Sequence, residues 1–165
     1  MKDFFDRSDI QTRIWLNWYH TSGLVTKYAD TKLSKIRGLS YQQFVVLLVM
    51  NRMGENANAT EMAKKLDKNT NTLSTILDRM EEKGLVKKIR DTQDRRLVWA
   101  TMTDKGKEKL NSTVKASWSM FETLTSVFTP EEMKIFNGLL EKLVKNTTKL
   151  LNPPKTAKKR KANID

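Results

Sequence analysis

The segment spanning residues 58–102 constrains the fold most, because two short helices and a β-hairpin must pack together within it. Asn58, with Glu61 three residues later, has the pattern of an N-terminal helix cap. A second helix begins at about Asn69 or Thr70, and Gly84 stands where a left-handed C-terminal cap is needed. The apolar positions of this second helix form one stripe: Leu73, Ile76, Leu77 and Met80. The two helices meet at a turn of about three residues, which is typical of a helix-turn-helix.

Two β-rich segments follow the second helix. Residues 85–90 and 97–102 are short and rich in β-forming side chains. The turn-prone sequence Asp91-Thr-Gln-Asp94 separates them. The pattern predicts an antiparallel hairpin, whereas the stretch from Gly54 to Asn58, before the first short helix, is expected to be a polar loop.

Long helices are predicted on both sides of this middle region. Residues 10–38 carry apolar side chains mostly at three- and four-residue spacing, as one stripe of a helix requires. Ser40 and Gln43 form a capping box, which makes the apolar run over residues 44–50 a buried helix rather than a strand.

The second half of the chain predicts two more helices. Thr103 caps the first, and Thr129-Pro130 with Glu132 has the pattern that starts the second. The apolar side expected for the first comprises Leu110, Val114, Trp118, Phe121, Leu124 and Phe128. The apolar side expected for the second comprises Phe136, Leu139, Leu140, Leu143, Leu150 and Leu151. The predicted fold class is mainly α with a small antiparallel β-hairpin.

Composition excludes most metal and covalent chemistry. The 165 residues include no Cys and a single histidine, His20. A Cys-ligated metal centre, a thiolate nucleophile and a His-based catalytic triad are therefore not expected. Asp91 and Asp94 form the one plausible acid–base pair, and the hairpin turn already accounts for both. We expect neither an enzyme nor a cofactor.

The charge balance indicates a polyanionic partner. Lys and Arg number 31 against 19 Asp and Glu, which gives a net charge of +12. Nucleic acid and an anionic membrane surface both fit this charge. No stretch reaches the roughly 18 apolar residues that span a bilayer, and the N-terminus lacks the apolar core of a signal peptide. A cytoplasmic protein without a membrane partner is expected.

Five stretches between residues 39 and 106 form a set of motifs. They are Leu39-Ser-Tyr-Gln-Gln-Phe44, Glu61-Met-Ala-Lys-Lys-Leu66, Leu73-Ser-Thr-Ile-Leu-Asp-Arg-Met-Glu-Glu-Lys-Gly-Leu-Val86, Asp91-Thr-Gln-Asp-Arg-Arg96 and Met102-Thr-Asp-Lys-Gly106. Together they resemble the MarR family of bacterial transcription regulators. The resemblance implies a winged helix-turn-helix, a two-fold homodimer on a pseudo-palindromic operator in double-stranded DNA, and repression of a promoter.

The second short helix would be the recognition helix. Its apolar stripe faces inward, so polar side chains remain on its outer surface, near an N-terminus that favours anions. The candidate DNA-binding residues are Thr70, Asn71, Thr72, Ser74, Thr75 and Arg79. Many family members have an arginine where this chain has Thr75, so its sequence preference is expected to differ. The alternative is that these residues form the ordinary solvated start of a helix and have no role in DNA binding.

The hairpin carries a concentrated positive charge. The fourteen residues 83–96 have a net charge of +4, which suits the phosphate backbone and an adjacent minor groove. The candidate wing residues are Lys87, Lys88, Arg90, Asp94, Arg95 and Arg96. By resemblance, Arg96 would enter the minor groove, Asp94 would hold its guanidinium and Arg95 would contact phosphate. A basic surface hairpin without a DNA role is the alternative.

The expected organisation is one compact domain with four parts. These are an N-terminal dimerisation helix at 1–38, a winged helix-turn-helix at 39–106, C-terminal dimerisation helices at 107–152 and a basic tail at 153–165. Wide apolar stripes need a covering surface, which a second copy supplies. A basic amphipathic helix on a membrane is the alternative for residues 136–151. The tail is expected to be disordered, and either adds attraction to phosphates or is a plain solvated terminus.

The resemblance also implies an effector. Many family members release DNA when a small aromatic or phenolic molecule enters a cleft between the dimer helices and the winged domain. The side chains that could line such a cleft are Trp15, Trp18, Tyr19, His20 and Trp118. Aromatic core residues, and a structural or surface histidine, are the alternatives. A thiol-oxidation switch is excluded because the chain has no Cys.

The predicted function is therefore a sequence-specific DNA-binding transcriptional repressor. A non-specific nucleic-acid-binding or architectural protein is the rival class. A strong preference for one sequence over competitor DNA distinguishes the two.

Overall fold

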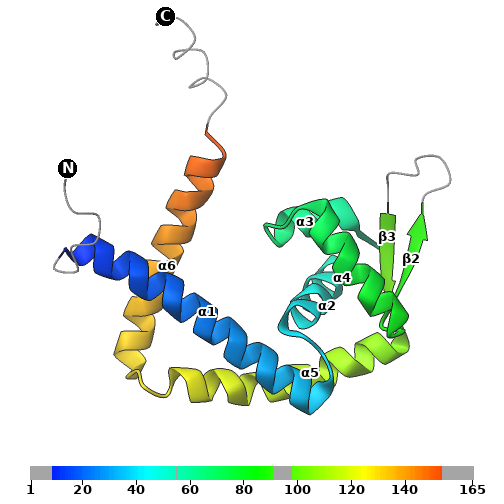
Figure 1. Ribbon diagram of the computed structural model, residues 1–165, viewed down its shortest axis with the longest axis horizontal. Coiled ribbons are helices and arrows are strands. Elements are labelled where there is room, and N and C mark those ends of the chain that lie inside the picture. Colours follow the sequence, from blue (N-terminus) through cyan, green and yellow to red (C-terminus); the bar gives the residue numbers. More distant parts are fainter. Residues whose placement is uncertain (1–8, 55, 91–97, 154–165) are drawn as a thin grey trace, which may run out of the picture. The chain divides into compact units, whose positions relative to one another are not determined.

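The computed structural model describes residues 9–54, 56–90 and 98–153, which form helices and a small antiparallel sheet (Figure 1). The elements are α1 (Ile10–Arg37), α2 (Tyr41–Met53), β1 (Ala57–Asn58), α3 (Ala59–Lys65), α4 (Thr70–Glu82), β2 (Val86–Arg90), β3 (Val98–Met102), α5 (Asp104–Thr125) and α6 (Pro130–Leu151). The chain divides into two compact units, residues 1–121 and residues 122–165. The predicted fold class, mainly α with a small antiparallel sheet, is confirmed.

Helix α1 begins and ends at its caps. The Asp9 carboxylate accepts a hydrogen bond from the Thr12 amide at 3.2 Å. Gly38 ends the helix with a φ of 64°, a left-handed conformation that favours glycine. Ala29 and Leu33, in the C-terminal half, are buried, and α1 packs against α2. The C-terminal half of α1 therefore belongs to the core of the first unit.

Helix α2 is the buried helix that its capping box predicts. The Ser40 hydroxyl accepts from the Gln43 amide, and the Gln43 side-chain oxygen accepts from the Ser40 amide, both at 3.2 Å. These bonds satisfy two amides that have no partner within the helix. The buried apolar residues of α2 are Phe44, Val46, Leu47 and Met50. Local capping thus makes this apolar run a helix rather than a strand.

Helices α3 and α4 form the predicted helix-turn-helix. The Asn58 side-chain oxygen accepts from the amides of Thr60 at 2.9 Å and Glu61 at 3.1 Å, which starts α3. The Asn69 side chain accepts from the Thr72 amide at 2.7 Å, which starts α4. The inward faces of both helices share one core: Met62, Ala63, Leu73, Ile76, Leu77 and Met80.

The sheet has three described strands in the order β1-β3-β2, one more than the predicted hairpin. Strands β2 and β3 pair antiparallel as predicted, with Lys88 opposite Ala100. On the other side of β3, Ala57 of β1 also lies opposite Ala100. The prediction of a polar loop from Gly54 to Asn58 was therefore wrong for the last two residues. A strand of two residues has no alternation to detect, and only its position beside β3 makes it a strand.

The start of α5 approaches the end of α4 closely. The Thr103 hydroxyl accepts from the Gly106 amide at 3.0 Å and donates to the Gly84 carbonyl oxygen at 2.7 Å. Gly106 is buried, and a Cβ atom there would overlap the Leu85 carbonyl oxygen. The absence of a side chain at this position allows the helix to pack on the backbone.

The buried face of α5 differs from the predicted apolar side. Its buried residues are Gly106, Leu110, Thr113, Ser117 and Met120. Trp118 and Phe121, expected on the inner side, are 66% and 38% exposed. The Thr113 and Ser117 hydroxyls donate to backbone carbonyls of their own helix at 2.6 and 2.7 Å. Because these hydroxyls are already paired, they can be buried at little cost, which hydropathy alone does not indicate.

The second unit contains α6, which starts at the predicted capping box. The Thr129 hydroxyl accepts from the Glu132 amide at 3.2 Å, and the Glu132 carboxylate accepts from the Thr129 amide at 2.8 Å. The rings of Phe128 and Phe136 stack with their centroids 5.5 Å apart. Pro130 is the first helical residue, where its missing amide hydrogen costs nothing.

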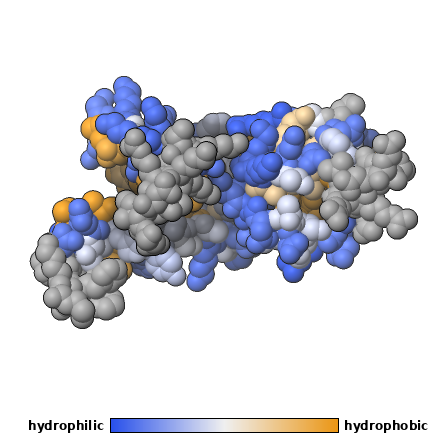
Figure 2. All heavy atoms as spheres, turned by 90° about the horizontal axis from the view of Figure 1, so that it is seen from above, coloured by the Kyte–Doolittle hydropathy of each residue, from blue (hydrophilic) through white to orange (hydrophobic). Residues whose placement is uncertain are grey.

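Large apolar side chains are exposed on several helices. On α6, where no residue is buried, they include Met133, Ile135, Phe136, Leu139, Leu143, Val144, Leu150 and Leu151. On α1 they are Ile10, Ile14, Trp15, Leu16, Trp18, Tyr19 and Leu24. Figure 2 shows hydrophobic residues reaching the surface among hydrophilic ones. No helix within the described ranges has both the length and the apolar character to cross a bilayer.

Candidate nucleic-acid interface

Helix α4 exposes the polar face predicted for a recognition helix. Its inward stripe of Leu73, Ile76, Leu77 and Met80 is buried, as the spacing predicts. The six predicted contact residues are all exposed: Thr70, Asn71, Thr72, Ser74, Thr75 and Arg79. The first turn contains no acidic residue, so nothing there opposes the positive end of the helix dipole.

The polar groups on this face can donate and accept hydrogen bonds at short range. The Thr75 hydroxyl donates to the Asn71 carbonyl oxygen at 3.1 Å, which leaves its lone pairs outward. Asn69 caps the helix and holds the first turn in place. A short, rigid and polar helix start suits the close approach of base edges and phosphates.

Strand β2, the first strand of the hairpin, packs beside α4. Strand β2 follows α4 after the turn at Gly84, whose φ is 68°. Lys87 is exposed on β2, and the Arg90 backbone pairs with Val98 at the end of the ladder. Three predicted wing residues, Asp94, Arg95 and Arg96, lie outside the described residues, as does the basic tail from residue 154.

Lys88, another predicted wing residue, faces helix α4. Its ammonium pairs with the Asp78 carboxylate and lies 3.8 Å from Glu81 Oε2. Its amide donates to Glu81 Oε1 at 2.7 Å. The Lys88 side chain is only 19% exposed. The sequence contained a signal for this arrangement that the charge count missed, because Asp78 and Glu81 are three apart and so share a helix face.

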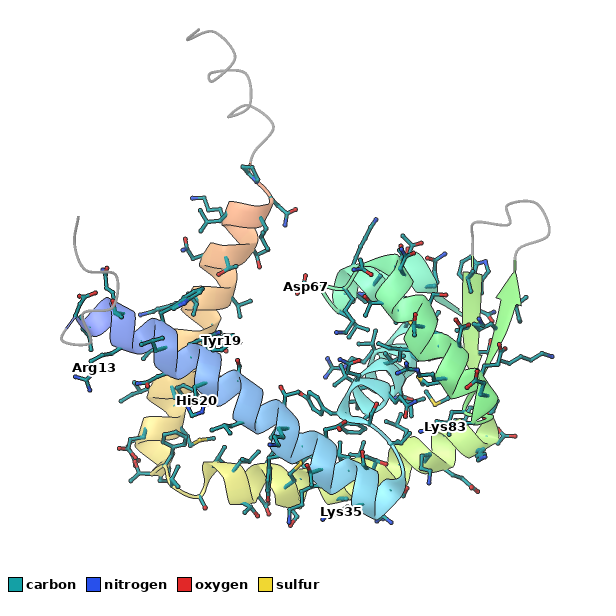
Figure 3. All side chains as sticks on the ribbon, viewed as in Figure 1. Arg13, Tyr19, His20, Lys35, Asp67 and Lys83 are labelled. Atoms are coloured by element: carbon teal, nitrogen blue, oxygen red, sulfur yellow. The ribbon has the colours of Figure 1, made fainter. Side chains whose placement is uncertain are left out.

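Lys83 also contributes to the positive charge of the 83–96 segment, but its ammonium group is hydrogen-bonded to other residues of the first unit. It lies at the end of α4 beside the start of β2 (Figure 3). Its ammonium donates to the Gly38 carbonyl oxygen at 3.3 Å and to the Gln43 side-chain oxygen at 3.1 Å. Lys83 therefore ties the end of α4 to the junction of α1 and α2. Not every cation in the local charge of +4 is free for a phosphate.

The residues predicted to line an effector cleft lie on exposed surfaces of two helices. Trp15, Trp18 and Tyr19 on α1 are 70%, 47% and 76% exposed, His20 is exposed, and Trp118 on α5 is 66% exposed. Figure 3 shows Tyr19 and His20 on the half of α1 that precedes its contact with α2. In the described single chain these four aromatic side chains do not belong to the hydrophobic core.

A pocket of about 620 Å³ opens elsewhere on the first unit. It lies between α1 and the start of α2, with Lys27, Tyr41 and Arg79 among its lining residues. None of the five predicted cleft residues lines it. Arg79 belongs to α4, so this pocket reaches the predicted recognition helix.

The described residues contain no group of three or more His, Asp or Glu side chains that could hold a metal ion. The site instead combines an exposed polar helix, set by a helix-turn-helix, with the strands of a basic hairpin. This arrangement defines the class of winged helix-turn-helix DNA-binding proteins.

Comparisons with known proteins agree with this class. The MarR family model matches residues 39–98. The transcriptional regulator MgrA of Staphylococcus aureus is 28% identical over 139 residues, which cover 84% of this chain and 92% of MgrA. In sequence over residues 39–98, and in fold, the chain is similar to the MarR family of DNA-binding transcriptional regulators. Members of this family are regulators rather than enzymes.

Solved structures share the fold. An organohalide-sensing transcriptional regulator in its 2,4-dichlorophenol-bound form has a TM-score of 0.81 at 20% identity, covering 90% of this chain and 88% of its own. A MarR mutant from E. coli complexed with operator DNA has a TM-score of 0.70 at 22% identity, covering 82% of this chain and 98% of its own.

Proposed function

We propose that this chain is a homodimeric repressor that binds a pseudo-palindromic operator and is released by a small aromatic or phenolic effector. The observation that carries the proposal is the exposed polar face of α4 directly beside strand β2. The E. coli MarR mutant of the same fold is complexed with operator DNA. In this proposal α4 enters the major groove and the hairpin turn reaches the adjacent minor groove.

The contact residues divide by role. Asn71, Thr72, Ser74 and Thr75 are proposed to face base edges and nearby phosphates, with Thr70 and Arg79 at the two ends of this face. Lys87, Arg90 and Arg95 would neutralise phosphates, and Arg96, oriented by Asp94, would enter the minor groove. The short hydroxyl of Thr75 limits its reach to the nearest base.

The dimer is proposed because α1 and α6 expose more apolar side chain than a single soluble chain usually leaves in water. A second copy of this chain would cover these faces through a two-fold interface. Residues 1–38 and 107–152 are proposed as its scaffold. Two recognition helices would then meet successive major grooves, roughly 34–36 Å apart.

Light scattering after size-exclusion chromatography should give twice the chain mass of 19.2 kDa. Leu143→Glu on α6 should shift the protein toward the monomer, because a charge would enter the apolar face. Lys145→Glu is the control, since at about 3.6 residues per turn it lies on the other side of the helix. A wild-type monomer at micromolar concentration, or equal effects of both variants, would contradict the dimer.

The effector is proposed to occupy the pocket that reaches α4. Lys27 and Arg79 could pair with a phenolate or carboxylate, and Tyr41 supplies an aromatic edge. Asp30 also lines the pocket, and its carboxylate accepts the Tyr41 amide at 2.9 Å. An effector held by Arg79 would compete with the role of this residue at the DNA. The relative of the same fold binds 2,4-dichlorophenol.

Adding 2,4-dichlorophenol should lower the fluorescence anisotropy of labelled DNA bound to this protein. Lys27→Met should raise the concentration needed for half-release by about tenfold, as expected when a charge-assisted hydrogen bond is removed. Lys35→Met is the control on the same helix, because Lys35 does not line the pocket. If Trp18→Ala blocks release while Lys27→Met does not, the effector binds at the exposed aromatic face of α1 instead.

Repression is tested on the DNA upstream of the gene that encodes this chain. A footprint with two half-sites that overlaps the promoter, and a reporter that rises when the gene is deleted, would support the proposal. If competitor DNA of random sequence displaces the labelled duplex as effectively as the unlabelled form of that duplex does, the rival class, a non-specific architectural protein, is favoured.

A further inference from the structure

Lys88 joins strand β2 to helix α4 at two points. Strand β2 is an edge of the described sheet, because β3 lies on one side of it and no strand lies on the other within the described residues. At this free edge the Lys88 amide donates to Glu81 Oε1 at 2.7 Å. A carboxylate of α4 therefore takes the place that a further strand or water would have.

The Lys88 side chain makes the second connection. Its ammonium pairs with Asp78 and approaches Glu81, one turn further along the same face of α4. Two neighbouring carboxylates on one helix face repel each other and would also repel phosphates, and the Lys88 ammonium offsets both effects. Lys87 and Lys88 point to opposite faces of β2, since side chains alternate along a strand. Lys87 is the exposed one of the two.

We propose that Lys88 is a positioning residue that fixes the wing strand relative to the recognition helix, and that it does not contact phosphate. The proposal rests on the role proposed above for α4 and the hairpin. Residues 91–97 follow strand β2 directly in the sequence, so the anchor on α4 would set the point from which they continue when α4 lies in the major groove.

A double-mutant cycle between positions 78 and 88 tests the proposal. The full chain is measured with a labelled duplex that it selects from a random-sequence pool, and with one unselected duplex. Glu81→Gln is the background for all variants, because glutamine keeps an oxygen for the Lys88 amide and removes the charge that Lys88→Glu would meet. The four proteins are this background, Lys88→Glu, Asp78→Lys and the charge-swapped pair. Lys87→Glu is the matched control for a lysine on the other face of β2.

The expected result is a strong coupling between the two positions. Lys88→Glu should weaken binding of the selected duplex by about tenfold, and the swapped pair should recover most of that affinity, as contacting charges do. Binding of the selected duplex by Lys87→Glu should remain weak when this substitution is combined with Asp78→Lys. It should also reduce the slope of log affinity against log salt by about 0.9 for each phosphate that Lys87 neutralises. Additive effects of positions 78 and 88, or no effect of Lys88→Glu, would overturn the proposal.

Hydrogen exchange of the DNA-free protein separates this proposal from the DNA assignment. The Lys88 amide should exchange about tenfold faster in Glu81→Leu than in Glu81→Gln, because leucine removes the acceptor. Equal exchange in both variants would overturn the anchor itself. A third outcome is that the Lys88 amide exchanges slowly in Glu81→Gln and that positions 78 and 88 are coupled on the unselected duplex, while the random pool yields no selected sequence. This outcome would support the anchor and contradict the operator proposal.

Discussion

Gly106→Ala is expected to destabilise the first unit by about 3 kcal/mol, the upper part of the range for forcing an extra carbon into a packed site. The added Cβ would overlap the Leu85 carbonyl oxygen and lie 2.8 Å from Met102 Cγ. The Met102 side chain can move, but the Leu85 backbone is held, since its carbonyl accepts bonds from the Thr103 amide and hydroxyl, each at 3.1 Å. The start of α5 must therefore shift away from the sheet.

Thermal unfolding followed by circular dichroism should show this destabilisation as a fall of roughly 10 °C in the melting temperature. Gly23→Ala is the matched control, because nothing lies within 4 Å of a Cβ atom at this helical position. That variant should gain up to about 1 kcal/mol from the higher helix propensity of alanine. Equal stability of Gly106→Ala and the wild type would mean that α5 does not pack on the Leu85 backbone.

Arg96→Ala is expected to weaken binding to the selected duplex by about tenfold to a hundredfold at constant salt. The reason is the role proposed for Arg96 in a narrow minor groove, where the negative potential favours a guanidinium and removal of one such side chain costs about 1–3 kcal/mol. The effect should be largest on duplexes with an A·T-rich segment outside each half-site, because the groove is narrowest there.

Fluorescence anisotropy across a salt series measures the effect of this substitution. Arg13→Ala is the control, because Arg13 is an exposed arginine in the first turns of α1 (Figure 3), the part of the helix before its packing against α2. Arg96→Lys should recover affinity for unselected DNA but not the A·T preference, since lysine keeps the charge without the planar fork. If Arg96→Ala binds the selected duplex as tightly as the wild type, the minor-groove assignment is wrong.

Much of the fold follows from interactions between neighbours in sequence. The caps at Ser40, Asn58, Asn69 and Thr129 each pair with amides two or three residues away, so the residue types alone mark where these helices begin. Helix α4, the proposed recognition helix, was predictable for the same reason, because its inward stripe and outward polar face follow from helical periodicity.

Two other features could not be predicted from the hydropathy of the sequence. Ala57 is in a strand only because β3 lies beside it. The buried face of α5 includes Thr113 and Ser117, whose hydroxyls are paired within their own helix. Neither feature has a signature in hydropathy, since one is too short and the other uses polar residues.

The sequence by itself determined the order of the helices, their caps, the hairpin and the excess of positive charge. These depend on local propensity, spacing and composition, which act over a few residues. Only the tertiary structure decided which cations are free. Lys87 remains exposed, whereas Lys88 pairs with Asp78, ten residues away, and Lys83 bonds to Gly38, 45 residues away. Whether a charged side chain interacts with solvent, with a phosphate or with another side chain depends on the distances between these groups in space. Those distances are set by the folded structure and not by the separation along the sequence.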